Sequence, residues 1–205
     1  MALGLASGKS ARDLKGLLGN IITKTFSDKR TESKECLRES KFKGENLEEI
    51  LENNEKGLGY VEAHTKLCDL NKLSQNSHNP HLRVIVTSVQ YQLGVNTRFT
   101  PILMDSENPE TGKFTLTQAA RSTSAAPTYF NGKRIDAQEK ETYFYDGGVF
   151  ANNPVAIGLE LALIKTSLKN IRLISISTGT ARSSEDSNWT SDILGLLTKS
   201  KEEIQ

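Results

Sequence analysis

The sequence predicts an α/β fold with a mostly parallel central sheet. Short segments rich in Ile, Val and aromatic residues, typical of buried strands, alternate with segments of helical pattern. A length of 205 residues fits one domain that can bury a core. No internal repeat or low-complexity tract interrupts the chain, so we expect a single domain over residues 1–205.

The first 80 residues predict a helical start followed by a polar insertion. In residues 1–19 two apolar clusters flank the stretch SGKSARD, where Ser10 or Asp13 can begin a helix. Residues 27–80 are rich in Lys, Glu, Asn and Ser, and GENLEEILEN is the clearest helical pattern among them. We expect this region to be an exposed insertion of helices and loops.

Two strands and a short helix are expected next. The stretch LRVIVTSVQ, residues 82–90, is rich in β-branched residues, and TRFTPILM, residues 97–104, follows after a short turn. Pro101 cannot donate a hydrogen bond to a neighbouring strand, which predicts an edge position or a bulge. The stretch LTQAARS, residues 116–122, predicts a short helix capped by Thr117.

The stretch TYFYDGGVFANNP, residues 142–154, contains the main candidate for chemistry. Its first four residues predict a short strand that ends at Asp146, and functional groups of open α/β sheets lie just past the carboxyl ends of strands. Gly147 and Gly148 predict a sharp turn with positive φ and a close backbone approach. Asp-Gly also forms ordinary turns, so a purely structural role for Asp146 stays open.

A helix is predicted directly after this turn. Asn153 is a favourable N-cap and Pro154 a favourable first helical residue, and the helical pattern continues to about Leu168. Four apolar residues are expected to pack this helix on the sheet: Val155, Leu159, Ala162 and Leu163. Beyond it, IRLISIS at residues 171–177 predicts another buried strand, and residues 189–203 predict a final helix.

The composition of the chain argues against some classes of function. The chain is 36% hydrophobic and 25% charged with a net charge of +1, which is typical of a globular protein and argues against nucleic acid as a main partner. No apolar run is long enough to span a membrane, and no signal peptide is visible. Two cysteines, Cys36 and Cys68, are too few for a disulfide framework. The compartment, cytoplasmic or secreted, stays open.

Other motifs favour structural interpretations. The stretch GLASGKS, residues 4–10, is one residue short of a phosphate-binding P-loop, and Ser7 within it lacks the strand-turn-helix context of a nucleophile. His78 and His81 lie three apart in a loop, and a metal site needs more ligands than these two. We expect Arg121 to form an ion pair or bind a carbonyl oxygen rather than a phosphate.

Three segments, in this order and at these intervals, carry a resemblance to a known family. They are QAARSTSAAPTYF at residues 118–130, TYFYDGGVFANNP at residues 142–154 and ISISTGT at residues 174–180. Together they resemble the patatin-like phospholipase family, and LRVIVTSVQ resembles the strand that precedes its Ala-Ala-Pro segment. The resemblance covers nearly the whole chain. It implies a three-layer α/β/α fold with core strands between residues 82 and 180.

The resemblance also implies an activity. Patatin-like proteins hydrolyse acyl esters of phospholipids and other lipids with a Ser-Asp dyad and no histidine, so the expected substrate is a lipid or a membrane surface. The family's Asp-Gly-Gly aspartate corresponds to Asp146. A partly desolvated carboxylate can take a proton from serine as histidine does elsewhere. No cofactor or metal is implied, and protein partners stay unknown.

The sequence departs from the family at the nucleophile. The 205 residues contain no Gly-x-Ser-x-Gly elbow and no Gly-rich loop of the kind that forms the family's oxyanion hole. We expect the serine to lie upstream of Met1, so that the chain is a partial patatin-like domain. The alternative is a catalytically dead fragment or a non-catalytic interaction remnant.

Overall fold

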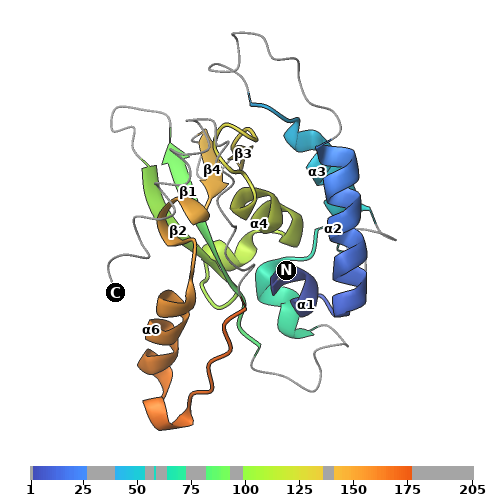
Figure 1. Cartoon of the computed structure of the whole chain (residues 1–205). Helices are drawn as coiled ribbons and strands as arrows, with labels where there is room; N and C mark the ends of the chain where they lie inside the picture. The colour runs from blue at the N-terminus through green and yellow to red at the C-terminus, as the bar shows by residue number, and fades with distance from the viewer. Residues whose placement is uncertain are drawn as a thin grey trace, which may run out of the picture. The chain divides into compact units, whose positions relative to one another are not determined.

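The chain divides into two compact units, Met1–Phe150 and Ala151–Gln205, which are described separately. A computed structural model describes the following residues: 2–26, 40–53, 58, 64–72, 82–92, 99–135 and 141–176. The first unit contains both helices and strands, as expected for a mixed α/β protein (Figure 1). The predicted helix over residues 189–203 and the histidines His78 and His81 lie outside the described residues.

Two helices of the first unit, α2 (Ala11–Thr25) and α4 (Leu116–Thr123), begin at side-chain caps. The unit also contains α1 (Ala2–Ala6) and α3 (Gly44–Glu52), with short 3-10 turns η2 (Leu67–Lys72) and η4 (Thr111–Lys113). The side chain of Ser10 caps α2 and accepts a hydrogen bond from the N–H of Asp13, while the Asp13 carboxylate accepts from the N–H of Ser10. The predicted start at Ser10 is confirmed.

The cap of α4 differs from the prediction by two residues. Thr115, not Thr117, is the N-cap, and it exchanges hydrogen bonds with Gln118 in a capping box. The box needs Glu or Gln three residues after the cap, and Gln118 stands at that distance from Thr115. Residue 120 is an alanine, so a capping box cannot form at Thr117, which is buried inside the helix instead.

The sheet of the first unit has the order β2-β1-β4-β3. Its strands are β1 (Ile85–Gln92), β2 (Phe99–Asp105), β3 (Lys133–Arg134) and β4 (Thr142–Asp146). All three pairings are antiparallel, so the expectation of a mostly parallel sheet is wrong for the described strands. Only six residues join β1 to β2, and a parallel pair needs a crossover of a dozen or more. Pro101 lies on β2, an edge strand, as predicted.

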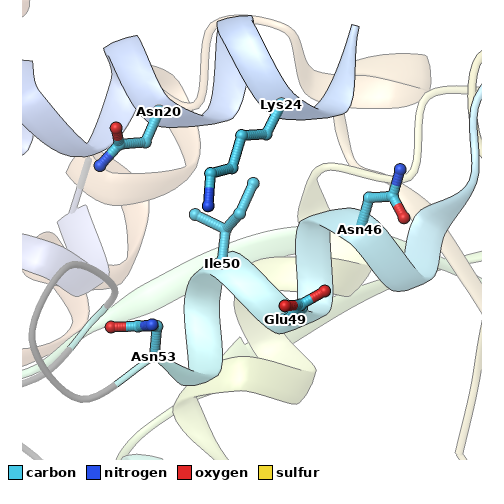
Figure 2. A pocket seen from close by; sticks show the side chains of 6 residues that line it. All are labelled: Asn20, Lys24, Asn46, Glu49, Ile50 and Asn53. Carbon is cyan, nitrogen blue, oxygen red and sulfur yellow. The ribbon is translucent and has the colours of Figure 1, made fainter. Parts of the chain in front are cut away.

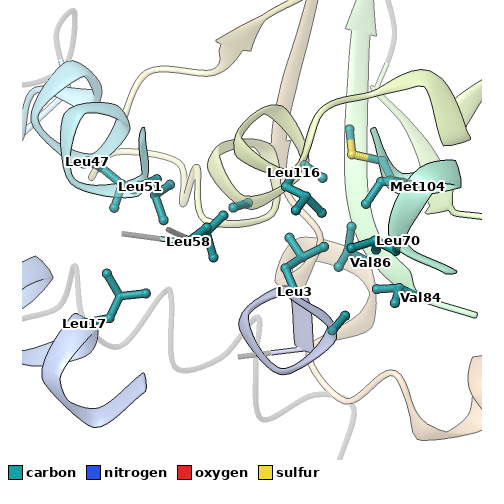
Figure 3. Close-up of a cluster of buried hydrophobic side chains, with 14 of the residues drawn as sticks. Leu3, Leu17, Leu47, Leu51, Leu58, Leu70, Val84, Val86, Met104 and Leu116 are labelled. Atoms are coloured by element: carbon teal, nitrogen blue, oxygen red, sulfur yellow. The ribbon is translucent and has the colours of Figure 1, made fainter. Parts of the chain in front are cut away.

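The core lies between α4, the sheet and the N-terminal helices. In Figure 1, α4 lies between the sheet and α2, and α3 contacts both α2 and α4. Leucines of α1, α2 and α3 belong to one buried cluster with strand residues such as Val86 and Met104, and Figure 3 shows this cluster. Phe144 of β4 is 1% exposed and packs edge-on against Phe114 at 5.4 Å between ring centroids. This core fixes β4, and with it the strand end that carries Asp146.

The second unit is helical in its described part. Helix α6 spans Val155–Lys165, shorter than predicted, and η5 spans Leu168–Asn170. None of the residues of α6 is buried, so the predicted burial of Val155, Leu159, Ala162 and Leu163 is not observed. The strand predicted over residues 171–177 is also wrong for residues 171–176, which form no regular structure and are mostly exposed. A strand needs a hydrogen-bonded neighbour, and no described strand of this unit provides one.

A helix that spans a membrane needs about 20 mainly apolar residues. Among the described residues, no helix combines the length and apolar character needed to cross a membrane.

Candidate active site

Asp146 lies at the carboxyl end of β4, as the sequence predicts. It pairs directly with Ser88 of β1 across the antiparallel ladder. The N–H of Asp146 donates a hydrogen bond of 3.0 Å to the carbonyl oxygen of Ala125, in the loop after α4. The strand end is therefore bound to β1 on one side and to the Ala-Ala-Pro loop on the other.

The carboxylate of Asp146 has one hydrogen-bond donor among the described residues. The N–H of Gly148, the first residue of α5 (Gly148–Ala151), donates to Oδ1 at 2.7 Å. Burial raises the pKa of the Asp146 carboxyl above its ordinary value, and the Gly148 hydrogen bond opposes part of this rise. An ionised carboxylate in these surroundings is a stronger base than an exposed aspartate, which suits proton abstraction from a weak acid such as a hydroxyl group.

Gly147 is needed because two segments of main chain come close together. A Cβ at this position would lie 2.2–2.3 Å from Thr87 Oγ1 and from the carbonyl carbon and oxygen of Thr87. The predicted close approach is thus present, but the predicted positive φ is wrong. Among the described glycines only Gly8 has positive φ, so neither Gly147 nor Gly148 adopts the left-handed conformation.

Ser88 was not predicted as part of the site, although the sequence contained a signal. Its side chain is fully buried, and its Oγ donates a 2.7 Å hydrogen bond to the carbonyl oxygen of Tyr145, next to Asp146. Thr87 and Ser88 are hydroxyl residues between the apolar residues Val86 and Val89 of β1. A buried hydroxyl must find a partner, so this pair could have been recognised as fixing a neighbouring strand.

The cap after the motif lies one residue later than predicted. Pro154 is the N-cap of α6 rather than its first residue, and the helix begins at Val155. Asn153 still accepts a hydrogen bond from the N–H of Val155, at 3.2 Å to Oδ1. Both residues belong to the second unit, so their side chains are described within that unit alone.

The remaining candidates behave as structural residues. Ser7 is fully buried and its Oγ donates to the carbonyl oxygen of Gly4 at 2.9 Å, an arrangement unlike that of an exposed nucleophile. Arg121 pairs with Glu48 and donates to the carbonyl oxygen of Asn131 at 2.7 Å, which confirms the expected ion pair and carbonyl contact. Within the described residues there is no group of three or more His, Cys, Asp or Glu that could hold a metal.

A pocket of about 210 Å³ lies between α2 and α3, away from the motif. Figure 2 shows Asn20 and Lys24 extending from α2 toward Asn46, Glu49 and Ile50 of α3. This pocket contains amides and one ion of each sign but no hydroxyl or thiol nucleophile. It offers no means of acyl transfer, so the strand end at Asp146 is the better candidate site.

The family assignment agrees with this geometry. The profile of the family described as patatin-like phospholipase matches residues 1–159, which contain β1, β4 and the Asp-Gly-Gly turn. The chain belongs to the patatin-like phospholipase family. The resemblance that the sequence motifs suggested is thereby confirmed.

Two curated patatin-like relatives extend the comparison. The chain is 33% identical over 165 residues to a protein of Escherichia coli named cGAMP-activated phospholipase, an alignment covering 78% of this chain and 40% of the relative. It is 42% identical over 81 residues to a protein of Vibrio cholerae with the same name, covering 38% of this chain and 21% of the relative. The chain therefore spans less than half the length of the relatives it matches. No solved structure matches the chain significantly.

Proposed function

We propose that this chain is part of a lipid acyl hydrolase in which Asp146 is the general base of a Ser-Asp dyad. One observation supports this above the others. Asp146 is a partly buried carboxylate at a strand end, held by the Gly148 N–H, in a chain of the patatin-like phospholipase family. The proposed substrates are carboxylic esters of phospholipids or other acyl lipids.

In the proposed reaction, Asp146 takes the proton of a serine hydroxyl while the serine oxygen attacks the ester carbonyl carbon. Collapse of the tetrahedral intermediate releases the lipid alcohol, which receives the proton from Asp146, and leaves an acyl-serine. Water then attacks the acyl-serine with Asp146 again as base, which releases the fatty acid and restores the serine. The serine belongs to a Gly-x-Ser-x-Gly elbow that is not among the 205 residues.

We also propose that the complete enzyme responds to cGAMP. This rests on the names of the two relatives, cGAMP-activated phospholipases, one of which aligns with 78% of this chain. Control by a nucleotide requires a site whose occupation changes the active geometry, so the proposal implies a second binding site besides the acyl site.

A non-catalytic role is the second candidate. The observation that favours it is the absence of a Gly-x-Ser-x-Gly sequence from the 205 residues. In that case the fold serves as an interaction module or has no retained activity.

The experiment compares the chain alone with the chain joined to an N-terminal segment that carries a Gly-rich loop and a Gly-x-Ser-x-Gly elbow, taken from an active patatin-like phospholipase. Hydrolysis of a chromogenic acyl ester and of phospholipid vesicles is measured with and without cGAMP. We expect no turnover by the chain alone and serine-dependent turnover by the joined protein, because losing oxyanion stabilisation and nucleophile each removes orders of magnitude in rate. Turnover by the chain alone, above that of its Asp146→Ala variant, would refute the proposal that the nucleophile lies outside the 205 residues. A folded joined protein without activity would favour the non-catalytic role.

A further inference from the structure

A second pocket, named here the Arg121 pocket, lies in the first unit at the edge of the sheet. Its volume is about 480 Å³, within the range of about 300–1,000 Å³ that is usual for small-molecule sites. Lining residues come from the first turns of α3, the end of α4, β3 and β4; they include Glu45, Glu48, Arg121, Lys133, Tyr143 and Tyr145. Asp146 is not among its lining residues, and along β4 the two tyrosines lie on the face opposite to Asp146.

Arg121 is the feature of this pocket that most needs explanation. Its side chain is 2% exposed, and Nη2 donates to the Asn131 carbonyl oxygen at 2.7 Å. Among the described residues, Nε and Nη1 have no hydrogen-bond partner, although Nε lies 3.4 Å from a carboxylate oxygen of Glu48. The guanidinium also lies over the ring of Phe130, at 5.6 Å from Cζ to the ring centroid. A buried guanidinium with unmet donors is costly, so a ligand that brings an acceptor to Nη1 would be favoured.

The charges around the pocket nearly cancel. Glu48 is shared by Arg121 and Lys133, whose Nζ lies 2.7 Å from Glu48 Oε2, while Arg134 pairs with Glu141 at 2.7 Å. Glu45 contributes the remaining negative charge. A simple anion such as phosphate gains little from so balanced a site. A ligand that offers acceptors to Arg121 and donors to Glu45 fits the charges better.

The pocket also offers aromatic surface. Tyr143 and Tyr145 both line it, and the ring of Tyr145 lies directly against Gly132, where a Cβ would come within 2.7 Å of the ring. Phe99 contacts Tyr145 edge-on, whereas Tyr143 makes no ring contact with another aromatic residue in the described chain. A tyrosine ring without an aromatic neighbour is available to stack on a flat ligand.

We infer that the Arg121 pocket binds the guanine base of a nucleotide. Guanine presents O6 and N7 as acceptors, which suit Arg121, and N1–H and N2–H as donors, which suit the Glu45 carboxylate. Its flat ring suits Tyr143. Adenine has an amino donor in place of O6 and an acceptor at N1, so the same groups disfavour it. The inference rests on the proposed control by cGAMP, which carries one guanine and one adenine base.

The test uses the full 205-residue chain and isothermal titration with cGAMP, GMP and AMP. We expect cGAMP and GMP to bind, and AMP to bind at least about tenfold more weakly, the discrimination typical of one bidentate base contact. Glu45→Gln should weaken GMP binding by about tenfold and reduce the preference over AMP, and Tyr143→Ala should weaken all three ligands. Glu110→Gln, at an exposed glutamate outside the pocket, is the matched control and should change nothing.

The outcomes separate this inference from the proposed function. Equal affinity for GMP and AMP, or GMP binding that Glu45→Gln leaves unchanged in a variant with wild-type thermal unfolding, overturns the guanine site. Competition by phosphatidylglycerol vesicles but not by AMP would identify a lipid headgroup site instead and also overturns it. Failure of GMP and cGAMP to bind the folded chain overturns it as well. By contrast, a joined enzyme whose hydrolysis ignores cGAMP refutes the proposed control, even if GMP still binds in the Arg121 pocket.

Discussion

The direct hydrogen bonds of Asp146 among the described residues are to main-chain groups. Its N–H is bound to the Ala125 carbonyl oxygen and its Oδ1 accepts from the Gly148 N–H, while Ser88 fixes the carbonyl of the preceding residue. Main-chain contacts of this kind lose little rotamer entropy and move only if the strand moves. A carboxylate held in this way keeps its geometry without help from a histidine, which suits the proposed Ser-Asp dyad.

The first prediction tests Asp146 as a base. In the joined, active protein, Asp146→Asn should lower turnover by about two orders of magnitude or more, because the amide keeps the shape but cannot accept the serine proton. Binding of a non-hydrolysable lipid should change little. Glu110→Gln, an exposed carboxylate, serves as the control for a lost charge. Unchanged turnover in the Asn variant would show that another group is the base.

The second prediction concerns stability and pH. The folded-state pKa of Asp146 is raised by burial, so the folded protein binds this proton more tightly than the unfolded chain does. The resulting stabilisation is present below the unfolded pKa of about 3.9 and is lost as pH rises through the folded pKa. Asp146→Asn should therefore have a higher Tm than the wild type at pH 7, and the difference should shrink toward pH 3. Thermal melts of both proteins across this pH range test it, and a lower Tm for the variant at pH 7 contradicts it.

At the scale of elements, the contact between the Asp-Gly-Gly turn and β1 leaves no room for a side chain on the turn. Gly147 lies against the main chain of Thr87, where a side chain would meet atoms that cannot rotate away. The turn can follow β4 at this point only if the residue has no Cβ. The glycine therefore serves the packing of two strands, and its conformational freedom is not used.

The third prediction follows from this contact. Gly147→Ala should destabilise the fold by about 1–3 kcal/mol, the usual cost of overpacking, because β1 or β4 must shift. Gly16→Ala is the matched control, since it lies on the exposed face of α2 with nothing within 4 Å of the added Cβ. There the same change should stabilise by roughly 0.5–1 kcal/mol through helix propensity. Urea unfolding of both variants measures the two effects, and equal effects of both changes would contradict the steric explanation.

Local patterns in the sequence predicted the positions of individual strands better than they predicted how the strands pair in the sheet. The strands over residues 85–92 and 142–146 and the edge position of Pro101 were predictable, because β-branched runs and a missing N–H act locally. Strand direction was not, because it depends on which strands become neighbours after the chain folds. The same reason explains the wrong prediction for residues 171–176, whose apolar run is typical of a strand but lacks a partner within its unit.

The candidate site was likewise predictable only in part. Asp146 and the need for a small residue at Gly147 could be predicted from the motif and from the family resemblance. The partners of Asp146 could not, since Ser88 lies 58 residues earlier and Ala125 is one of several small residues in its loop. Contacts between distant segments follow from register, and no local pattern in the sequence specifies register uniquely.

For the whole molecule, the distribution of buried side chains predicts where stability resides. Every residue of the core cluster lies between Leu3 and Phe144, within the first unit, and α6 contributes no buried residue. The fourth prediction is that a chain of residues 1–150 unfolds cooperatively with nearly the Tm of the full chain. Calorimetry of the two chains tests it. A fall of ten degrees or more, on the order of several kcal/mol for this size, would show that the second unit supports the core.

The pairing of Asp146 with Ser88 also has a consequence for how a gene of this kind can change. Successive side chains of a strand alternate between its two faces, so the loss or gain of one codon within β4 would turn Asp146 to the side that Tyr145 now occupies. The strand could still form, and the protein could still be made, but its acid would face the wrong way. Asp146 thus keeps its face of the sheet only if the number of residues lost or gained within β4 is even. Deletions of two residues would shorten the strand, whereas a deletion of one residue would remove Asp146 from the proposed site while leaving a foldable relative behind.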